Sequence, residues 1–344
     1  MPDRFKPPQG WLWWINMVLA ALLIGATLAF ALVSLAVGRV PYDYGLFVSA
    51  AERFCFHPEY FRYGDAGRVY YPAPLYTALC LPARYAEPLL RLLWMTAPVT
   101  LGLWMARGRA AALLIPPLGD QLILGQSTWL LLPQYWLAER TTQGDRATFW
   151  HGLLAALGVF KPHVAALAWV WLAVRWRGQW RAYAGWLAGV LLLSVPAFVL
   201  RPDWPLAWLA VALGGRADDS TIGRASLYLV ADRLGLPPLI GWAGCLLAAG
   251  LIFLALKRRR GRMVFYDWVL VFALSNPLLN AYDLIFLLPC LLSDRRRIGV
   301  ALVGGVAAWV FAFLAGTFSL SIFVPLVLLV ERLWRVESMR ATTA

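Results

Sequence analysis

The stretch from Gly38 to Pro74 reads GRVPYDYGLFVSAAERFCFHPEYFRYGDAGRVYYPAP and is the first polar interval after the first apolar run of the chain. It follows an unbroken apolar run, Trp11 to Val37, which is long enough to cross a bilayer and too long for the core of a cleavable signal peptide. Within the polar interval, apolar residues recur at helical spacing, with polar residues turned away from them. This pattern predicts a short helix that lies in the membrane interface as a lid. Its apolar positions are Leu46, Phe47, Ala50, Ala51 and Phe54.

Asp43 lies in a Tyr-Asp-Tyr triplet just beyond the first apolar run. An acid at this place is expected just above the hydrocarbon layer and beneath the predicted lid. Such a carboxylate can cap the lid helix or simply mark the membrane interface. It can also serve as a general base for a substrate at the interface. The residues alone leave both interpretations open.

Composition defines the class of protein. Hydrophobic residues make up 61% of the 344 and charged residues only 14%, and the mean hydropathy is +0.65, so there are too few polar groups to coat a soluble domain. The formal charge of +13 is carried by short basic clusters between apolar runs, which indicates membrane orientation rather than nucleic-acid binding. The sequence therefore predicts an all-α polytopic membrane protein, a single domain over residues 1–344 surrounded by lipid.

The cysteines and histidines predict neither a disulfide framework nor a metal site. The histidines are too scattered for a metal triad, so we expect no metal and no other cofactor. No CxxC pair is present, and most of the cysteines lie in apolar runs. We expect all of them to be small core residues: Cys55, Cys80, Cys245 and Cys290.

The polar loops predict the orientation of the chain. Two longer loops, 38–72 and 201–237, balance arginines against acids and are expected outside the cell. The apolar runs Ala182–Leu200 and Pro238–Leu256 then cross the membrane once each. Three segments are basic and poor in acids, which places them in the cytoplasm by the positive-inside rule: Arg175–Arg181, Lys257–Arg262 and Asp294–Arg297.

The remaining apolar runs are shorter and broken. Several are too short to span ~30 Å of hydrocarbon as a straight helix of ~20 residues. Polar residues or prolines mark their junctions at 120–126, 161–163 and 275–283. Non-helical backbone at membrane depth needs protein or water around it, so these breaks are expected to line one internal cavity, as broken helices do in transporters. Counting broken helices, we expect about ten to thirteen membrane helices.

These junctions carry side chains suited to chemistry. Lys161 lies amid apolar sequence, where it can snorkel to an interface or present a point charge to an anion such as phosphate. The segment Gly125–Thr128 inserts an amide and two hydroxyls, which can also serve helix–helix hydrogen bonding. The last junction contains Asn276, Asn280 and Asp283, and Asp283 is placed to cap a helix. Because no Walker loop and no GxGxxG motif is present, any donor substrate is expected to come from within the membrane.

Six motifs occur in order over about residues 10 to 300. They are Val40-Pro41-Tyr42-Asp43-Tyr44, Tyr71-Pro72-Ala73-Pro74, Leu124-Gly125-Gln126, Phe160-Lys161-Pro162, Asp219-Ser220-Thr221-Ile222-Gly223, and Asn276-Pro277 with Tyr282-Asp283-Leu284. Together they resemble the motifs of glycosyltransferase family 87, the DUF2029 group of the GT-C superfamily. The chain departs from the family pattern at Ala73, Thr128 and Asp219, and it lacks a histidine that many members place near Ala281–Tyr282.

The resemblance implies a GT-C type bundle and an inverting membrane glycosyltransferase. Such an enzyme moves mannose or a pentose such as arabinofuranose from a polyprenyl-phosphate donor to a lipid or glycan acceptor. It works on the extracytoplasmic face of the cell membrane, and neither a nucleic acid nor a protein partner is implied. Asp43 would be the catalytic base, and Lys161 with His163 would bind the donor phosphate. The residues carried over to the substrate cavity are Tyr42, Tyr71, Gln126, Thr128, Ser220, Asn280, Tyr282 and Asp283.

A polytopic transporter or flippase of a lipid-linked sugar is the alternative, because broken helices and intramembrane charges are equally expected there. A carrier needs its charges near the midplane with access from both sides. A transferase needs Asp43 and Lys161 to face one outer cavity. The placement of these two residues therefore distinguishes the two functions.

Overall fold

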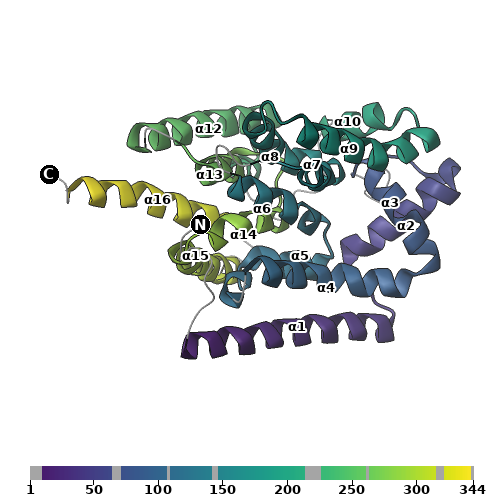
Figure 1. The fold of residues 1–344 in the computed structure, drawn as a ribbon, viewed down its shortest axis with the longest axis horizontal. Helices are drawn as coiled ribbons and strands as arrows, with labels where there is room; N and C mark the ends of the chain where they lie inside the picture. Colours follow the sequence, from purple (N-terminus) through teal and green to yellow (C-terminus); the bar gives the residue numbers. More distant parts are fainter. Residues whose placement is uncertain are drawn as a thin grey trace.

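The computed structural model describes residues 10–63, 71–106, 109–141, 146–213, 226–260, 263–314 and 321–341, and these residues are mostly helical (Figure 1). In chain order the α-helices are α1 (Trp11–Val37), α2 (Tyr42–Phe56), α3 (Ala73–Tyr85), α4 (Glu87–Ala106), α5 (Pro116–Leu124), α6 (Leu132–Arg140), α7 (Phe149–Ala156), α8 (Pro162–Arg175), α9 (Trp180–Leu200), α10 (Trp204–Leu213), α11 (Tyr228–Arg233), α12 (Pro238–Arg260), α13 (Phe265–Ser275), α14 (Leu288–Leu292), α15 (Arg295–Leu314) and α16 (Phe323–Ala341). Short 3₁₀ segments between them are η1 (Pro58–Tyr60), η2 (Ala110–Leu113), η3 (Thr128–Leu131), η4 (Leu157–Phe160) and η5 (Ala281–Leu287).

Five of the described helices, α1, α4, α9, α12 and α15, are long and apolar enough to cross a membrane. Their outer faces leave large hydrophobic side chains exposed, such as Leu192, Leu239 and Phe313 at 72%, 80% and 87%. A soluble protein would cover contiguous apolar surface of this kind, whereas lipid covers it without cost. The fold therefore agrees with the helical membrane protein that composition predicts. The total of ten to thirteen membrane helices stays a prediction.

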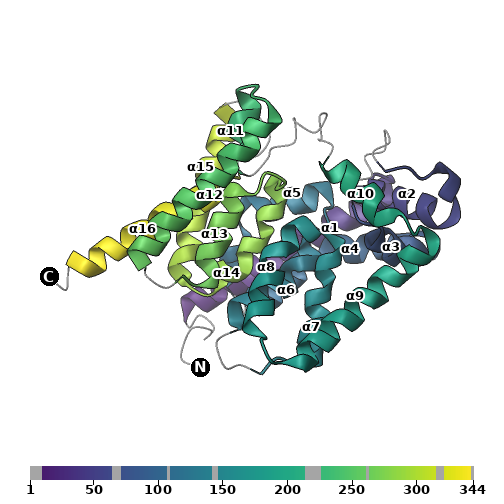
Figure 2. The same cartoon turned by 90° about the horizontal axis from the view of Figure 1, so that it is seen from above.

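The molecule has two distinct ends (Figure 2). Both chain termini lie at the lower left of that view, and we call this the base end. Helices α2, α10 and α11 lie toward the right and the top, and we call this the lid end.

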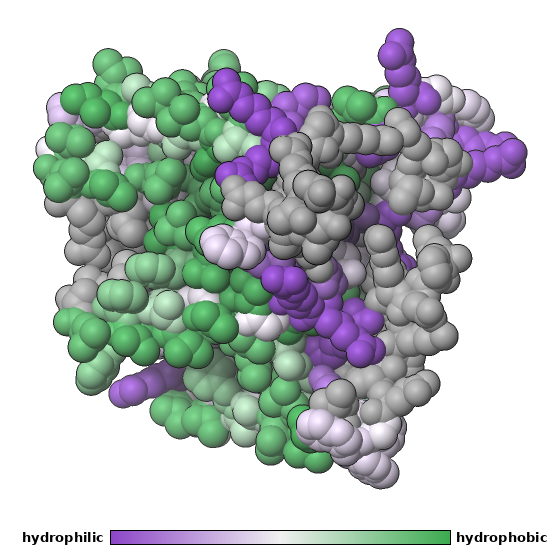
Figure 3. Space-filling view, turned by 90° about the vertical axis from the view of Figure 1, so that its left-hand side faces the viewer, coloured by the Kyte–Doolittle hydropathy of each residue, from purple (hydrophilic) through white to green (hydrophobic). Residues whose placement is uncertain are grey.

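Figure 3 looks from the left of Figure 1 and shows hydrophilic side chains over its centre and right, next to hydrophobic ones on its left. Several basic residues of the loops expected in the cytoplasm are exposed: Arg177, Arg181, Lys257, Arg258, Arg295 and Arg296.

Between the long helices lie three hairpins of short helices: α5 with α6, α7 with α8, and α13 with η5 and α14. Each helix of these pairs is shorter than the ~20 residues that cross hydrocarbon. Hydrogen bonds near the base end hold the open ends of the hairpins, where each hairpin begins and finishes. Arg109, before α5, donates from Nη1 to the carbonyl of Leu292 at the end of α14, at 2.8 Å. The backbone N–H of Ala147, before α7, donates to the side chain of Gln179, after α8. The hairpins thus return to the end at which they begin.

Paired charges join the hairpins to the last two helices at the same end. Asp267, in the first turn of α13, accepts a hydrogen bond of 2.6 Å from Nε of Arg332 on α16. Arg297 of α15 lies 3.7 Å from Glu139 at the end of α6 and stacks 3.8 Å from the ring centre of Tyr266. Asp267 is fully buried and Arg332 is 5% exposed. The base of the bundle is therefore held together by compensated charges.

The helix predicted over 46–54 is confirmed as α2, which begins at Tyr42, whereas its place in the membrane interface stays a prediction. Its buried face packs on α3 and within an aromatic cluster that includes Trp94 and Phe61. Of the predicted apolar positions only Leu46 is not buried, and Tyr44 takes part instead. The helix thus turns its apolar face toward protein. The buried residues of α2 are Tyr44, Phe47, Ala50, Ala51 and Phe54.

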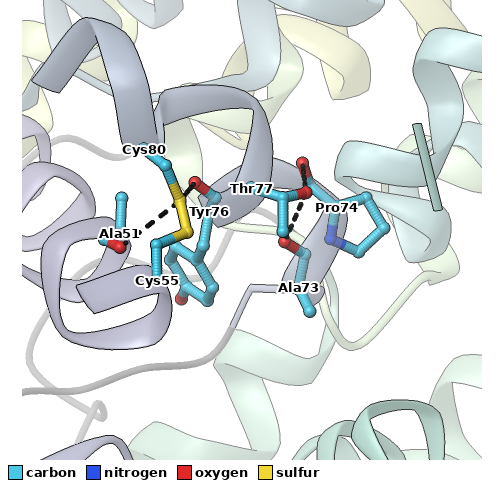
Figure 4. Close-up of a disulfide and its surroundings, with 7 residues drawn as sticks. All are labelled: Ala51, Cys55, Ala73, Pro74, Tyr76, Thr77 and Cys80. Atoms are coloured by element: carbon cyan, nitrogen blue, oxygen red, sulfur yellow. Dashed lines mark hydrogen bonds between the residues drawn. A yellow bond between two sulfur atoms is a disulfide. The ribbon is translucent and has the colours of Figure 1, made fainter. Parts of the chain in front are cut away.

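The prediction for Cys55 and Cys80 is wrong, because the two form a disulfide between α2 and α3 (Figure 4). Their Cα atoms lie 6.1 Å apart, within the usual range for a bridged pair. The packing of α2 on α3 brings the two together, although 25 positions separate them in the sequence. Cys245 and Cys290 are buried and form no disulfide, as predicted. Disulfides persist in oxidising compartments, so this bond agrees with an extracytoplasmic lid end.

Candidate functional site

The tips of the three hairpins meet beneath the start of α2. The first tip is the turn after α5, where Gly125 has φ 70°, a left-handed conformation that favours glycine. A Cβ at this position would approach the Cβ atoms of Pro41 and Tyr44 to 2.8 Å. The Gly125 carbonyl accepts a hydrogen bond of 2.8 Å from the indole of Trp94. Glycine at 125 therefore allows the first tip to lie directly against the lid helix.

Lys161 forms the second tip, between η4 and α8, and it is ion-paired. Its Nζ lies 2.6 Å from Oδ1 of Asp283, and the two side chains are 2% and 0% exposed. The same Nζ donates to the Thr128 hydroxyl at 2.9 Å and to the Tyr71 hydroxyl at 3.1 Å. Because an ammonium carries three N–H donors, these partners match its full donor set. The expectation of a point charge that awaits an anion is therefore corrected: Lys161 already has a buried counter-charge.

Asp283 accepts hydrogen bonds from two sides. The Thr128 hydroxyl donates to its Oδ1 at 2.7 Å, next to the Lys161 ammonium. Its Oδ2 accepts the backbone N–H of Asn280 at 2.9 Å, which forms the capping box at the start of η5. The capping role considered for Asp283 is thus confirmed, and the same carboxylate also neutralises Lys161. Sequence reasoning missed this pairing, although an isolated lysine and an acid in two apolar segments are the residue types that pair at membrane depth.

Asp43 joins this cluster through Gln126. The Gln126 amide nitrogen donates to Oδ2 of Asp43, and its amide oxygen accepts from the Tyr71 hydroxyl. Tyr71 in turn accepts from Lys161. A continuous hydrogen-bonded path therefore runs from the lid acid to the buried ion pair. Asp43 is half-buried, whereas Gln126 is only 2% exposed.

Asp43 does not cap the lid helix. The N-cap residue of α2 is Pro41, and no side chain caps that end. Asp43 lies in the first turn, where a negative charge is favourable toward the helix dipole. The carboxylate is nevertheless directed to Gln126, a residue of another element. The geometry thus favours a role within the cluster over a purely local one.

Tyr282 and Asn280 border the ion pair. The Tyr282 ring centre lies 4.7 Å from Nζ of Lys161, within the range of a cation–π contact, and Tyr71 makes a similar contact at 5.0 Å. The Asn280 amide donates to the Tyr282 hydroxyl at 2.7 Å. Both residues lie at the third tip, between α13 and α14. Aromatic faces and hydroxyls thus surround the Lys161 ammonium.

Of the other predicted residues, His163 and Tyr42 belong to the described part of the chain and Ser220 does not. His163 is half-buried on the first turn of α8, and its carbonyl accepts a hydrogen bond of 3.0 Å from the Asn276 amide. Tyr42 is 51% exposed on α2. Ser220 and the motif around it fall in 214–225, outside the described residues. Within the described part of the chain, no group of three or more His, Cys, Asp or Glu side chains is arranged to hold a metal ion.

Comparisons of the chain with protein-family models, with curated proteins and with solved structures found no match.

Proposed function

We propose that the protein is a membrane glycosyltransferase of the GT-C type that takes its sugar from a polyprenyl-phosphate donor at the lid end. One observation carries this proposal. Five of the six motif segments, far apart in the sequence, supply a side chain to one hydrogen-bonded cluster. These side chains are Asp43, Tyr71, Gln126, Lys161 and Asp283. If each of these residues only stabilised its own segment, the five side chains would not be expected to form one cluster.

In the proposed reaction the hydroxyl oxygen of an acceptor attacks the anomeric carbon of the donor sugar. The bond between that carbon and the phosphate oxygen breaks, and polyprenyl phosphate leaves with the bonding electrons. Asp43 takes the proton of the attacking hydroxyl, a contribution of about 10²–10⁴ in rate for general-base catalysis. Its half-buried position at the start of α2 suits a base that meets a substrate at the interface. A single displacement inverts the anomeric configuration.

Lys161 is proposed to stabilise the leaving phosphate. Because it is already paired, the donor phosphate would replace the Tyr71 hydroxyl as one of its three partners, while Asp283 and Thr128 keep the ammonium in place. His163 is two positions away, on the first turn of α8, and is proposed to contact the same phosphate. The N-terminus of α8 lies at this tip, and helix N-termini favour anions.

A flippase of a lipid-linked sugar is the second candidate, because polar hairpin tips within a membrane bundle are typical of transporters. A flippase must open toward both sides. The cluster adjoins the lid helix, whereas the base end is tied by the pairs Asp267–Arg332 and Glu139–Arg297. This one-sided arrangement supports the transferase.

The test uses the purified full chain in proteoliposomes with a polyprenyl-phosphate sugar that carries a radiolabel in the sugar. A transferase moves the label to an acceptor fraction from bacterial membrane lipids and glycans and leaves unlabelled polyprenyl phosphate. A flippase moves the intact donor between leaflets, measured by periodate accessibility, without breaking the sugar–phosphate bond. Transbilayer movement without cleavage of any mannosyl or arabinofuranosyl donor would overturn the proposal.

A further inference from the structure

A polar depression lies on the lid end, apart from the Asp43 cluster, on the face of α2 that is turned away from the protein core. It encloses about 680 Å³ and is lined by Ser49, Glu52, Arg53, His57 and Tyr60. Every lining side chain carries a hydrogen-bonding group. The depression is separate from the cluster around Asp43, because that cluster is covered by the opposite, buried face of α2.

The functional groups of this depression are free to bind a ligand. Among the described residues, the side chains of Ser49, Glu52 and Arg53 form no hydrogen bond or ion pair with the protein. The ring of Tyr60 is 68% exposed. His57 has weak neighbours, with Nδ1 3.9 Å from Glu59 and its ring 6.4 Å from that of Tyr60. An exposed aromatic ring beside free donors and acceptors is a surface suited to a polyhydroxylated ligand.

The wall of the depression is held in place. Cys55, between the lining residues of α2, forms the disulfide to Cys80 on α3 (Figure 4). The next residue, Phe56, packs under the guanidinium of Arg84, 4.3 Å from its ring centre. A rigid support lowers the cost of ordering these side chains when a ligand binds. Three of the five lining residues, Ser49, Glu52 and Arg53, thus lie on a helix that this disulfide holds in place.

The charge of the lining distinguishes between ligand classes. Glu52 and Arg53 contribute one carboxylate and one guanidinium to the lining, and Glu59 lies beside His57. Acids would oppose a phosphate or another anion, and the guanidinium would oppose a cation. Both a carboxylate and a guanidinium can make paired hydrogen bonds to neighbouring hydroxyls of a neutral sugar. The arrangement therefore suits a neutral saccharide better than a lipid phosphate.

We propose that this depression binds the neutral oligosaccharide part of the acceptor, so that the enzyme extends a glycan chain rather than a single sugar. The acceptor role rests on the proposed function, whereas saccharide binding itself does not. The remote part of the acceptor would lie on the outer face of α2, while its reacting hydroxyl reaches Asp43 around the start of the same helix. Binding energy from this remote part would hold the acceptor for reaction.

The experiment measures binding of neutral tetrasaccharides of mannose and of arabinofuranose to the purified full chain in nanodiscs, by saturation-transfer NMR and calorimetry. At least one tetrasaccharide should bind, and Arg53→Ala and Tyr60→Leu should each weaken that binding tenfold or more. Arg62→Ala removes an exposed arginine outside the lining and should leave binding unchanged. Thermal unfolding of each variant shows that the fold is intact, and Glu52→Gln offers a milder change if one of them unfolds early.

Absence of binding by both tetrasaccharides, or equal binding by wild type and the two variants, would overturn this inference. Stronger binding of glycerol 1-phosphate than of either tetrasaccharide would identify an anion site instead and would also overturn it. The same measurement on Asp43→Asn separates the two proposals, because that variant should bind saccharide normally. If it binds saccharide while the wild type transfers no sugar, the proposed function fails and the saccharide site stands.

Discussion

Replacement of both members of the Lys161–Asp283 ion pair should damage the fold far less than the sum of the two single replacements. Lys161→Met leaves Asp283 as an uncompensated charge with no exposed surface. Removal of one partner of a buried pair costs about 3–5 kcal/mol, because the remaining charge stays desolvated. The double variant Lys161→Met with Asp283→Asn carries no charge at this place. Asparagine can still accept the hydrogen bond that Thr128 donates to Asp283 at 2.7 Å.

The coupling free energy between Lys161 and Asp283 follows from comparing the unfolding free energies of the single variants with that of the double variant. We expect each single variant to lose about 3–5 kcal/mol and the double variant to lose much less than their sum, a coupling of about 2 kcal/mol or more. The measurement is thermal unfolding of all four proteins in the same detergent, followed by the fluorescence of the chain's 19 tryptophans. Additive losses, with the double variant as unstable as the sum of the singles, would refute the reasoning.

The same double variant separates structure from function. If Lys161 only compensates Asp283, the folded double variant should bind a labelled polyprenyl-phosphate sugar as the wild type does. If Lys161 also contacts the donor phosphate, the folded double variant should bind the donor at least tenfold more weakly. A stable double variant with wild-type donor binding would remove Lys161 from the phosphate site.

Three further predictions concern orientation, redox state and metal dependence. Single cysteines introduced into Arg201–Pro237 should react with an impermeant maleimide from outside, and those in Lys257–Arg262 only from inside, as the charges of these loops predict; labelling of both from one side would contradict the topology. Cys55→Ser should lower the free energy of unfolding by about 2–4 kcal/mol, because it removes the disulfide to Cys80. In the wild type, a maleimide polymer should label Cys80 only after reduction. Labelling of Cys80 without reductant would disprove the disulfide. Sugar transfer should survive EDTA, because Lys161 supplies positive charge at the proposed phosphate site, and activity lost to EDTA and restored by magnesium or manganese would point to a metal.

Much of the fold could be predicted from sequence because hydrophobic length and charge bias act locally. The apolar run Trp11–Val37 forms one helix, and the spacing in 46–54 forms the buried face of α2. The breaks at 120–126 and 161 coincide with hairpin tips. Their polar residues are buried, as the cost of exposing them to lipid requires.

The parts that sequence could not predict depend on which helices pack together. The pairing of Lys161 with Asp283 and the bond from Cys55 to Cys80 each join residues on different elements. Periodicity tells which face of a helix is apolar, but it does not tell which other helix covers that face. The hydrogen bond from Gln126 to Asp43 depends in the same way on the close approach that Gly125 permits.

The central claim is that Asp43 is the base of a sugar transfer, and Asp43→Asn tests it most directly. Asparagine is nearly isosteric, and its carbonyl oxygen can still accept the hydrogen bond from Gln126, so the cluster should stay intact. The measurement is transfer of labelled sugar from the polyprenyl-phosphate donor in membranes, with donor binding to the purified variant measured in parallel. Asp203→Asn, which removes one exposed carboxylate near the start of α10, serves as the control. We predict that Asp43→Asn lowers transfer by about a hundredfold or more while the donor still binds, and that the control transfers normally. Transfer by Asp43→Asn at the wild-type rate would contradict the account.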